Sequence, residues 1–222
     1  MEADFWLDVW KRSDIGFHQA EINAHLQEFW DRLGLADGDP VFVPLCGKSR
    51  DMLWLRSRGH PVLGVEISPL AVHGFFAENG LVPERRTRGA LESFAVDGLE
   101  ILRGDFFQLQ AADLRGIVGV YDRASLIALP PPMRQRYAEH LLEILPPEAQ
   151  IMLVTMNYPQ EQMPGPPFSL TEEEVERLYV ARYRVLPLFE KDILQESPRF
   201  RARGLQSLRE LVYHLRADRA AR

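Results

Sequence analysis

The chain has 222 residues, of which 46% are hydrophobic and 10% aromatic, enough for one substantial core. Its formal net charge is -6, from 26 basic and 32 acidic residues, which does not favour a nucleic-acid partner, because proteins that bind nucleic acid usually present a basic face. Cys46 is the only cysteine, so an intramolecular disulfide and a cysteine metal cluster are excluded.

No targeting signal is evident. The stretch MEADFWLDVWKR mixes acids with aromatics and lacks the apolar core of a signal peptide. No apolar run approaches the roughly 18 residues that suggest a membrane span. We therefore expect a soluble cytoplasmic protein with a small-molecule ligand and no nucleic-acid or membrane partner. The absence of a large apolar stripe favours a monomer.

The first half of the chain alternates short apolar runs with amphipathic stretches, which indicates an α/β fold. The predicted elements are, in order, a helix over 17–33, a strand over 41–45, a helix over 48–58 that stops at Gly59, a strand over 61–68 and a helix from Ser68-Pro69 to near Gly80. Two strands and two helices within about forty residues indicate a βαβ unit with parallel strands.

The second half adds a hairpin, further strands and a proline-rich loop. Asp97-Gly98 suits a tight turn between antiparallel strands, and Thr171 with Glu174 is typical of a capping box. The predicted elements are a hairpin of 91–96 and 99–104, strands over 117–122 and 149–156 separated by a helix from the prolines at 130–132 to about Leu145, a loop over 158–170, a helix from Thr171 to about Tyr179, and edge strands over 183–193 and 205–216.

Gly47-Lys48-Ser49 suggests at first sight a loop that binds nucleotide phosphates. Such a loop needs a glycine five positions before the Gly-Lys pair, and that position is Phe42. Pro44, inside the stretch, has no amide hydrogen to donate. Asp122, at a strand end, imitates a magnesium-holding acid, but many strands end in Asp. The sequence favours a strand-to-helix turn with a solvated Lys48 over a nucleotide hydrolase.

Glu66 ends the second predicted strand, about 20 residues beyond the first turn. Ligands of open parallel sheets bind outside the carboxyl ends of the strands, where a carboxylate accepts hydrogen bonds from both ribose hydroxyls. This geometry serves nicotinamide dinucleotides and S-adenosylmethionine alike. A dinucleotide normally requires several glycines in the first turn, which has only Gly47. The turn is compatible with S-adenosylmethionine, which carries a sulfonium and no phosphate.

Five stretches of the chain match the sequence pattern of a known family: FHQ at 17–19, VFVPLCGKSRDM at 41–52, RGHPVLGVEIS at 58–68, YDRASLIAL at 121–129 and PGPPFSLTEEEVERLY at 164–179. On these stretches the chain closely resembles the thiopurine S-methyltransferases, a family of S-adenosylmethionine-dependent enzymes. The resemblance implies a single methyltransferase domain over 1–222 with the class I fold, a Rossmann-like, doubly wound, seven-stranded, mostly parallel sheet. Residues 1–38 would form a helical cover over the active site.

The resemblance also implies site residues. Those that bind the donor would be Trp10, Leu45, Glu66, Asp105, Phe106 and Arg123, and those that border the acceptor would be Phe17, Pro166 and Pro167 in the loop 164–168. An aromatic face such as that of Trp10 attracts cations, although a core anchor is the simpler alternative. Cys46 is expected to be a small buried residue and not a nucleophile.

The implied reaction is a direct, in-line transfer of the methyl group to an acceptor sulfur, without a metal or a covalent enzyme intermediate. Aromatic thiols ionise readily, so no strict general base is assigned, and Arg123 would favour the anionic acceptor. Three alternatives stay open: methylation of selenium or tellurium species in metalloid detoxification, a metabolite-binding domain that transfers nothing, and a phosphate-loop hydrolase.

Overall fold

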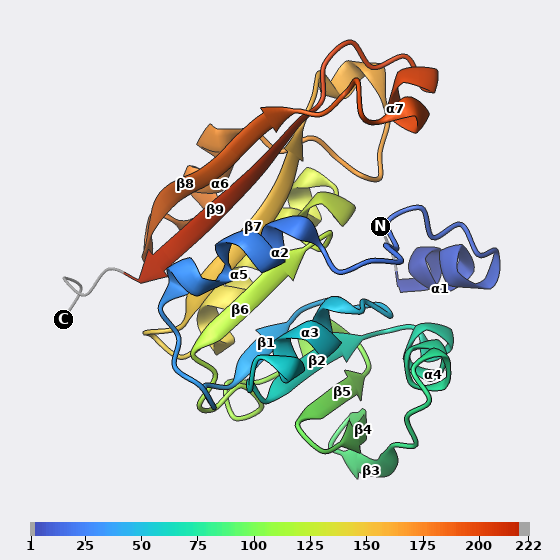
Figure 1. Cartoon of the computed structure of the whole chain (residues 1–222), viewed down its shortest axis with the longest axis vertical. Helices are drawn as coiled ribbons and strands as arrows, with labels where there is room; N and C mark the ends of the chain where they lie inside the picture. Colours follow the sequence, from blue (N-terminus) through green and yellow to red (C-terminus); the bar gives the residue numbers. More distant parts are fainter. Residues whose placement is uncertain (1–2, 218–222) are drawn as a thin grey trace. The chain divides into compact units, whose positions relative to one another are not determined.

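The computed structural model describes residues 3–217, and their contacts divide them into two compact units. The first unit contains the described residues up to Tyr121 together with Ile144–Pro146, and the second contains Asp122–Glu143 and the described residues from Pro147 onward. Figure 1 labels the α-helices and strands of both units. No helix among residues 3–217 is both long and apolar enough to cross a membrane.

The first unit holds most of the parallel strands. Its elements are α1 (Ala3–Lys11), α2 (Ala24–Phe29), the 3-10 helix η1 (Trp30–Leu33), β1 (Val41–Val43), α3 (Asp51–Ser57), β2 (Val62–Glu66), α4 (Pro69–Glu78), β3 (Glu84–Arg88), β4 (Leu91–Val96), β5 (Leu99–Arg103), η2 (Phe106–Gln108) and the start of β6 (Gly119–Arg123).

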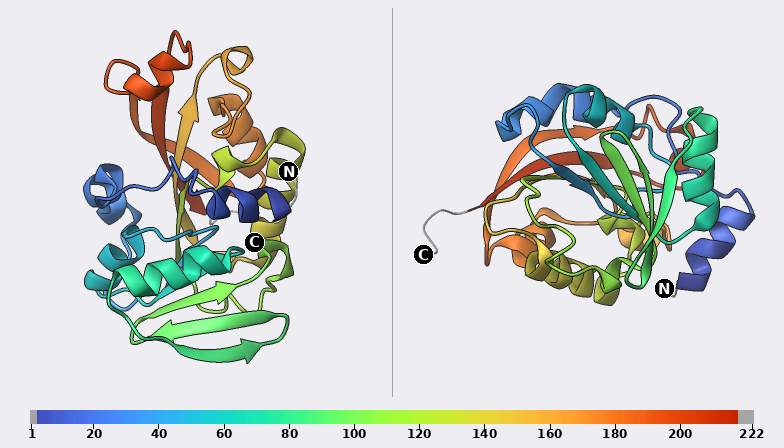
Figure 2. Two further views of the ribbon diagram at one scale, coloured as in Figure 1. Left: turned by 90° about the vertical axis from the view of Figure 1, so that its right-hand side faces the viewer. Right: turned by 90° about the horizontal axis from the view of Figure 1, so that it is seen from below.

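Parallel pairing in this unit joins β1 to β2 and to β6, and β2 to β5. All residues of β1 and β2 are buried, as expected for parallel strands with both faces covered. Antiparallel pairing then adds β4 and β3 beyond β5, and Figure 2 shows this hairpin beside β5 with α4 running alongside. The core side of β4 carries Phe94, whose ring lies 6.3 Å from that of Phe76 on α4.

The second unit consists of an antiparallel group of strands with helices. Its elements are the end of β6, η3 (Leu126–Ala128), α5 (Pro131–Ile144), which ends one residue outside the unit, β7 (Gln150–Asn157), η4 (Gln160–Gln162), α6 (Glu172–Tyr179), β8 (Tyr183–Asp192), α7 (Pro198–Ala202) and β9 (Arg209–Ala217). Strand β9 pairs antiparallel with both β7 and β8.

The α/β fold class is confirmed, but two predictions about its elements are wrong. The described residues hold nine strands and not the seven that the resemblance implies, and β3 in particular has no counterpart among the strands predicted from the sequence. The helix predicted over 17–33 begins only at Ala24, because the Asn23 side chain accepts hydrogen bonds from the amides of His25 and Leu26 and caps it there. Helical spacing from Phe17 to Ile22 was therefore coincidental.

Candidate functional site

The turn after β1 is built against the end of β2. The parallel register sets Val43 opposite Gly64, so the residues after β1 run beside Val65 and Glu66. The Cys46 amide donates to the Val65 carbonyl oxygen at 2.9 Å, and Leu45 and Gly47 adopt positive φ values of 44° and 54°. The predicted Leu45 and Glu66 are thus brought together within the first unit.

Glu66 holds this turn through its side chain. Glu66 is 5% exposed; its Oε2 accepts from the Gly47 amide at 2.9 Å and its Oε1 from the Ser68 amide at 2.7 Å. Burial raises the pKa of Glu66 to about 7, although its hydrogen bonds to backbone amides act in the opposite direction. A carboxylate has about four acceptor positions, so the two oxygens retain the capacity to accept from a ligand diol.

The same geometry excludes a phosphate from the turn. The Gly47 amide, which a phosphate would require, already points at a carboxylate. Lys48 Nζ lies 2.6 Å from Glu78 Oε1 on α4, and the Lys48 side chain is only 15% exposed. The expectation of a solvated Lys48 is therefore wrong, because Glu78 draws the ammonium onto the neighbouring helix. Neither Gly47 nor Lys48 is arranged as a phosphate-binding loop needs.

Helix α1 lays an aromatic side chain on this turn. A Cβ atom added to Gly47 would lie 3.2 Å from Trp10 Cζ2, so the indole occupies the space that a larger residue would fill. Phe17 packs edge-on against both Trp10 and Trp6, with ring centroids 5.7 and 5.8 Å apart. Trp10 is 8% exposed, and Phe17 is half-buried. The predicted Trp10 therefore lies against the turn that carries Leu45, and the predicted Phe17 packs against Trp10.

Gly47→Ala is expected to lower the free energy of unfolding by about 1–3 kcal/mol, because a side chain at this φ is strained and its methyl group would press on Trp10. Chemical denaturation measures the loss, and tryptophan emission reports the displaced indole. Gly38→Ala is the matched control, since Gly38 has a φ of 86° but nothing within 4 Å of an added Cβ. Equal losses with unchanged emission in both variants would contradict the contact.

Sulfur atoms pack under the turn in the interior of the sheet. A Cβ atom on Gly64 would lie 2.8 Å from Cys46 Sγ and 3.2 Å from Met52 Sδ, so only glycine leaves room for both. Cys46 is 6% exposed, and burial, followed by the charge of Glu66, raises the pKa of its thiol well above the ordinary value. These observations match the expected buried, unreactive cysteine.

Asp105 and Phe106 follow β5 in the same unit. The Asp105 carboxylate caps η2 by accepting from the Phe107 amide at 3.0 Å, and the side chain is half-buried. Phe106 is 3% exposed and packs edge-on against Phe107. The Gly104 amide donates to the Glu66 carbonyl oxygen at 2.9 Å, which ties this segment to the end of β2.

Arg123 lies in the second unit, at the end of β6, and is half-buried. The next residue, Ala124, adopts a φ of 61°, which is uncommon for a residue with a side chain. Asp122 is fully buried and accepts from the Tyr137 hydroxyl at 2.7 Å. Burial raises the pKa of Asp122 to about 6, although the Tyr137 hydrogen bond acts in the opposite direction. The Asp122 side chain is therefore part of the buried interior of the second unit.

The loop with Pro166 and Pro167 also belongs to the second unit. Gly165 has a φ of 78°, and a Cβ atom there would lie 2.5 Å from the Phe168 ring, so the phenyl group folds back over the glycine. Pro166 and Pro167 are half-buried, and both follow cis peptide bonds. The Phe168 amide donates to the Ile127 carbonyl oxygen at 2.6 Å and joins the loop to η3.

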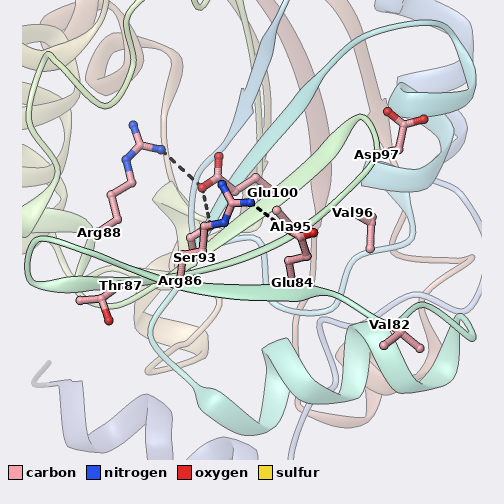
Figure 3. Close-up of a pocket in the computed structure, with 10 residues that line it drawn as sticks. All are labelled: Val82, Glu84, Arg86, Thr87, Arg88, Ser93, Ala95, Val96, Asp97 and Glu100. Carbon is pink, nitrogen blue, oxygen red and sulfur yellow. Dashed lines mark hydrogen bonds and ion pairs between the residues drawn. The ribbon is translucent and has the colours of Figure 1, made fainter.

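A groove of about 740 Å³ lies on the open face of the β3–β4 hairpin (Figure 3). Arg86 is paired with Glu84 at 2.6 Å, and Arg88 with Glu100 at 3.5 Å. The Ser93 hydroxyl donates to the same Glu100 oxygen at 2.6 Å. The two arginines are thus already paired with carboxylates. None of the residues that line the groove is one of the predicted site residues.

Sequence reasoning missed the residues that hold these parts in place. Gly47 has a signal, since it is the one glycine of the first turn. The end of the proline-rich loop is held by hydrogen bonds with the side chains of Arg134, Tyr158 and Gln160. The sequence predicted only the prolines of this region as site residues. In the described part of the chain, no group of three or more His, Cys, Asp or Glu residues is arranged to hold a metal.

Comparisons with known proteins find relatives that match almost the whole length of the chain. The sequence profile of the family described as thiopurine S-methyltransferase matches residues 1–218. A thiopurine S-methyltransferase of Nitrosospira multiformis is 49% identical over 215 residues, which cover 97% of this chain and 98% of that protein. One from Pseudomonas fluorescens is 46% identical over 222 residues and covers 100% of both.

Solved structures agree on the fold. The 1,6-didemethyltoxoflavin-N1-methyltransferase of Burkholderia thailandensis, solved with bound 1,6-didemethyltoxoflavin and S-adenosylhomocysteine, superposes with a TM-score of 0.62 at 14% identity, covering 97% of this chain and 87% of that one. A SAM-dependent methyltransferase from Anabaena variabilis gives 0.66 at 14% identity, with 97% and 95% covered. The class I methyltransferase fold is confirmed.

Proposed function

We propose that this chain, which belongs to the thiopurine S-methyltransferase family, transfers the methyl group of S-adenosylmethionine to the sulfur of an aromatic or heterocyclic thiol such as a thiopurine. The observation that carries the proposal is the Glu66 carboxylate, buried at the carboxyl end of β2 and bonded to the Gly47 amide. That arrangement repels phosphate and retains acceptor capacity for the two hydroxyls of a ribose.

The residues of the first unit fit the donor. Glu66 would accept from the ribose hydroxyls, and Leu45 would contact the donor from the turn. Trp10 would face the sulfonium end, where an aromatic ring favours positive charge. Asp105 and Phe106 would flank the adenine. When bound, S-adenosylmethionine supplies an electrophilic methyl group that an acceptor sulfur takes in a direct in-line displacement.

The acceptor is assigned to Phe17, Arg123 and the rim formed by Pro166 and Pro167. The guanidinium of Arg123 would stabilise the thiolate form of the acceptor, which is the nucleophile. Aromatic thiols are partly ionised near neutral pH, so a general base is not required. Catalysis then depends mainly on the alignment of the two reactants, an effect that contributes about 7–11 kcal/mol at most in well-oriented intramolecular reactions.

Two measurements test this function. Calorimetric titration with S-adenosylhomocysteine should give saturable binding, and Lys48→Ala should not abolish it. Labelled donor should methylate at least one thiol in a panel of thiophenols and thiopurines. Donor binding with no transfer to any acceptor would favour a metabolite-binding domain instead. Magnesium-dependent ATP binding that is lost in Lys48→Ala would favour the hydrolase.

The natural acceptor requires a wider screen. Selenium and tellurium species belong in the panel, because their anions are also soft nucleophiles that accept a methyl group. A kcat/KM that is higher for such species than for every thiol would redirect the proposal to metalloid methylation. We further propose that the enzyme works as a cytoplasmic monomer, which sedimentation analysis of the purified protein checks for the oligomeric state.

A further inference from the structure

A buried arginine on α5 supports the residue that directly follows the loop 164–168. Arg134 lies in the first turn of this helix and is 1% exposed. Its Nη1 lies 2.8 Å from Glu174 Oε1, and its Nη2 donates to the Ser169 carbonyl oxygen at 3.2 Å. Burying a guanidinium is costly unless it is paired, and an apolar residue would fill the same space at lower cost. The charge therefore points to a role beyond packing.

The side chain of Glu174 pairs with Arg134 instead of completing the capping box that the sequence predicts with Thr171. The Thr171 hydroxyl accepts from the Glu174 amide at 3.2 Å, which is the first half of a capping box. The Glu174 carboxylate, however, lies against Arg134, and its side chain is 17% exposed. The start of α6 and the end of the loop are thus held by one buried cation.

Residues that follow β7 hold the same loop from a second direction. The Tyr158 hydroxyl donates to the Pro167 carbonyl oxygen at 2.5 Å, and Tyr158 is 3% exposed. The Tyr158 amide donates to Ser169 Oγ, and the Gln160 side chain accepts from the Ser169 amide, both at 2.9 Å. The backbone carbonyls of Pro167 and Ser169, one on either side of Phe168, therefore each accept a hydrogen bond from a buried side chain.

We propose that Arg134 and Tyr158 are positioning residues that fix Pro167 and Phe168 and so determine which acceptors the enzyme takes. The inference rests on the proposed function, in which this loop borders the acceptor. Tyr158 acts through the carbonyl oxygen of Pro167 in the loop, and Arg134 through that of Ser169 directly after it. When the carbonyls of Pro167 and Ser169 are both held, the rim formed by Pro166 and Pro167 keeps one shape and selects acceptors by size. When these hydrogen bonds are lost, we expect the enzyme to discriminate less between acceptors of different size.

Arg134→Met and Tyr158→Phe test the proposal. Each is expected to raise the KM for a bicyclic thiopurine by about tenfold and to change kcat much less, because the loop and not the reacting atoms is disturbed. The ratio of kcat/KM between a bicyclic thiopurine and a thiophenol should fall by about fivefold or more. Affinity for S-adenosylhomocysteine should be unchanged, and amide hydrogen exchange should accelerate in a peptide over 158–171.

Arg136→Met is the matched control, since Arg136 is exposed two residues along the same helix, and it should leave the selectivity ratio at the parent value. If Arg134→Met does not fold, Tyr158→Phe still decides, because it removes a single hydroxyl group. Folded variants with parent KM, selectivity and loop exchange would overturn the inference alone. A parent protein that binds S-adenosylhomocysteine but methylates no acceptor would overturn the proposed function and this inference with it.

Discussion

Glu66→Gln is expected to raise the dissociation constant of S-adenosylhomocysteine by about 100-fold or more. An amide offers a single acceptor oxygen where the carboxylate offers two, and a hydrogen bond to a charged group contributes about 1.5–3 kcal/mol. The Gly47 and Ser68 amides already use one position on each carboxylate oxygen, so Gln also leaves one of them facing an NH₂ group. Calorimetric titration measures the affinity, and thermal unfolding reports the accompanying loss of stability.

Glu78→Gln is the matched control, because Glu78 is a carboxylate on the adjacent helix α4 whose side chain is 54% exposed and paired with Lys48. The dissociation constant of S-adenosylhomocysteine for the Glu78→Gln variant should stay within about twofold of the parent value. An unchanged affinity in Glu66→Gln, measured on protein that is folded, would remove Glu66 from the donor site.

The pKa of Glu66 makes the same site sensitive to pH. Because burial raises that pKa to about 7, the free protein carries a proton on Glu66 in about half of its molecules near neutrality. Ribose hydroxyls donate more strongly to the ionised form, so binding should release a proton near pH 7 and affinity should fall as pH drops below it. Titrations in two buffers of different ionisation enthalpy count the proton, and Glu66→Gln should release none.

The stability of the free protein depends on the same carboxyl group, but folding favours the protonated form of Glu66, whereas donor binding favours the ionised form. A raised pKa in the folded state means that the folded chain binds the proton more tightly than the unfolded chain does. The stability contribution is therefore complete below about pH 4.5, the ordinary value, and is lost as pH rises through about 7. Bound donor should reduce this loss at alkaline pH, because it gives the charged carboxylate further hydrogen-bond donors.

Arg123→Met is expected to lower kcat/KM for an aromatic thiol by about 100-fold, because a charge-assisted contact to the thiolate would be lost. A guanidinium near the acceptor lowers the pKa of its thiol, so in the variant the acid limb of the kcat profile should move to higher pH. Arg123→Lys keeps the charge and should lie between the two. Steady-state rates across a pH series give both quantities.

Arg115→Met supplies the control for this experiment, since Arg115 is exposed in the described structure and the substitution removes the same charge from the protein. Donor affinity is measured separately, because Arg123 is assigned to the donor as well as to the acceptor. A parallel fall in the rate at every pH, without movement of the acid limb, would contradict stabilisation of the anionic acceptor.

Much of the fold follows from local sequence features. The apolar runs of β1 and β2 are buried on both faces, and the Ser68 side chain caps α4 by accepting from the Ala71 amide as predicted. The Asp97-Gly98 turn joins β4 to β5 in the antiparallel hairpin expected from it. In each case a few neighbouring residues carry the whole signal, so no knowledge of the tertiary structure is needed.

The parts that escaped prediction depend on residues distant in the chain. Strand β3, Glu84–Arg88, has no apolar alternation, and it is a strand only because it pairs with β4 in a register that sets Arg86 opposite Ser93. Lys48 meets a carboxylate 30 residues further on, which no local pattern reveals. Glu66 could be located from its position at a strand end, but its bond to the Gly47 amide required the folded turn.

Because the Cys46 thiol is packed against Gly64, the rate at which it reacts with a reagent reports how often this part of the structure opens locally. A sulfur atom so enclosed, with its pKa raised, reacts with a thiol reagent only after the turn beneath Glu66 has separated from β2. Its labelling rate therefore gives the free energy of that opening directly, in a chain with no second cysteine to confuse the signal. S-adenosylhomocysteine should slow the labelling in proportion to its occupancy of the site, and a rate independent of the ligand would show that the turn opens without it.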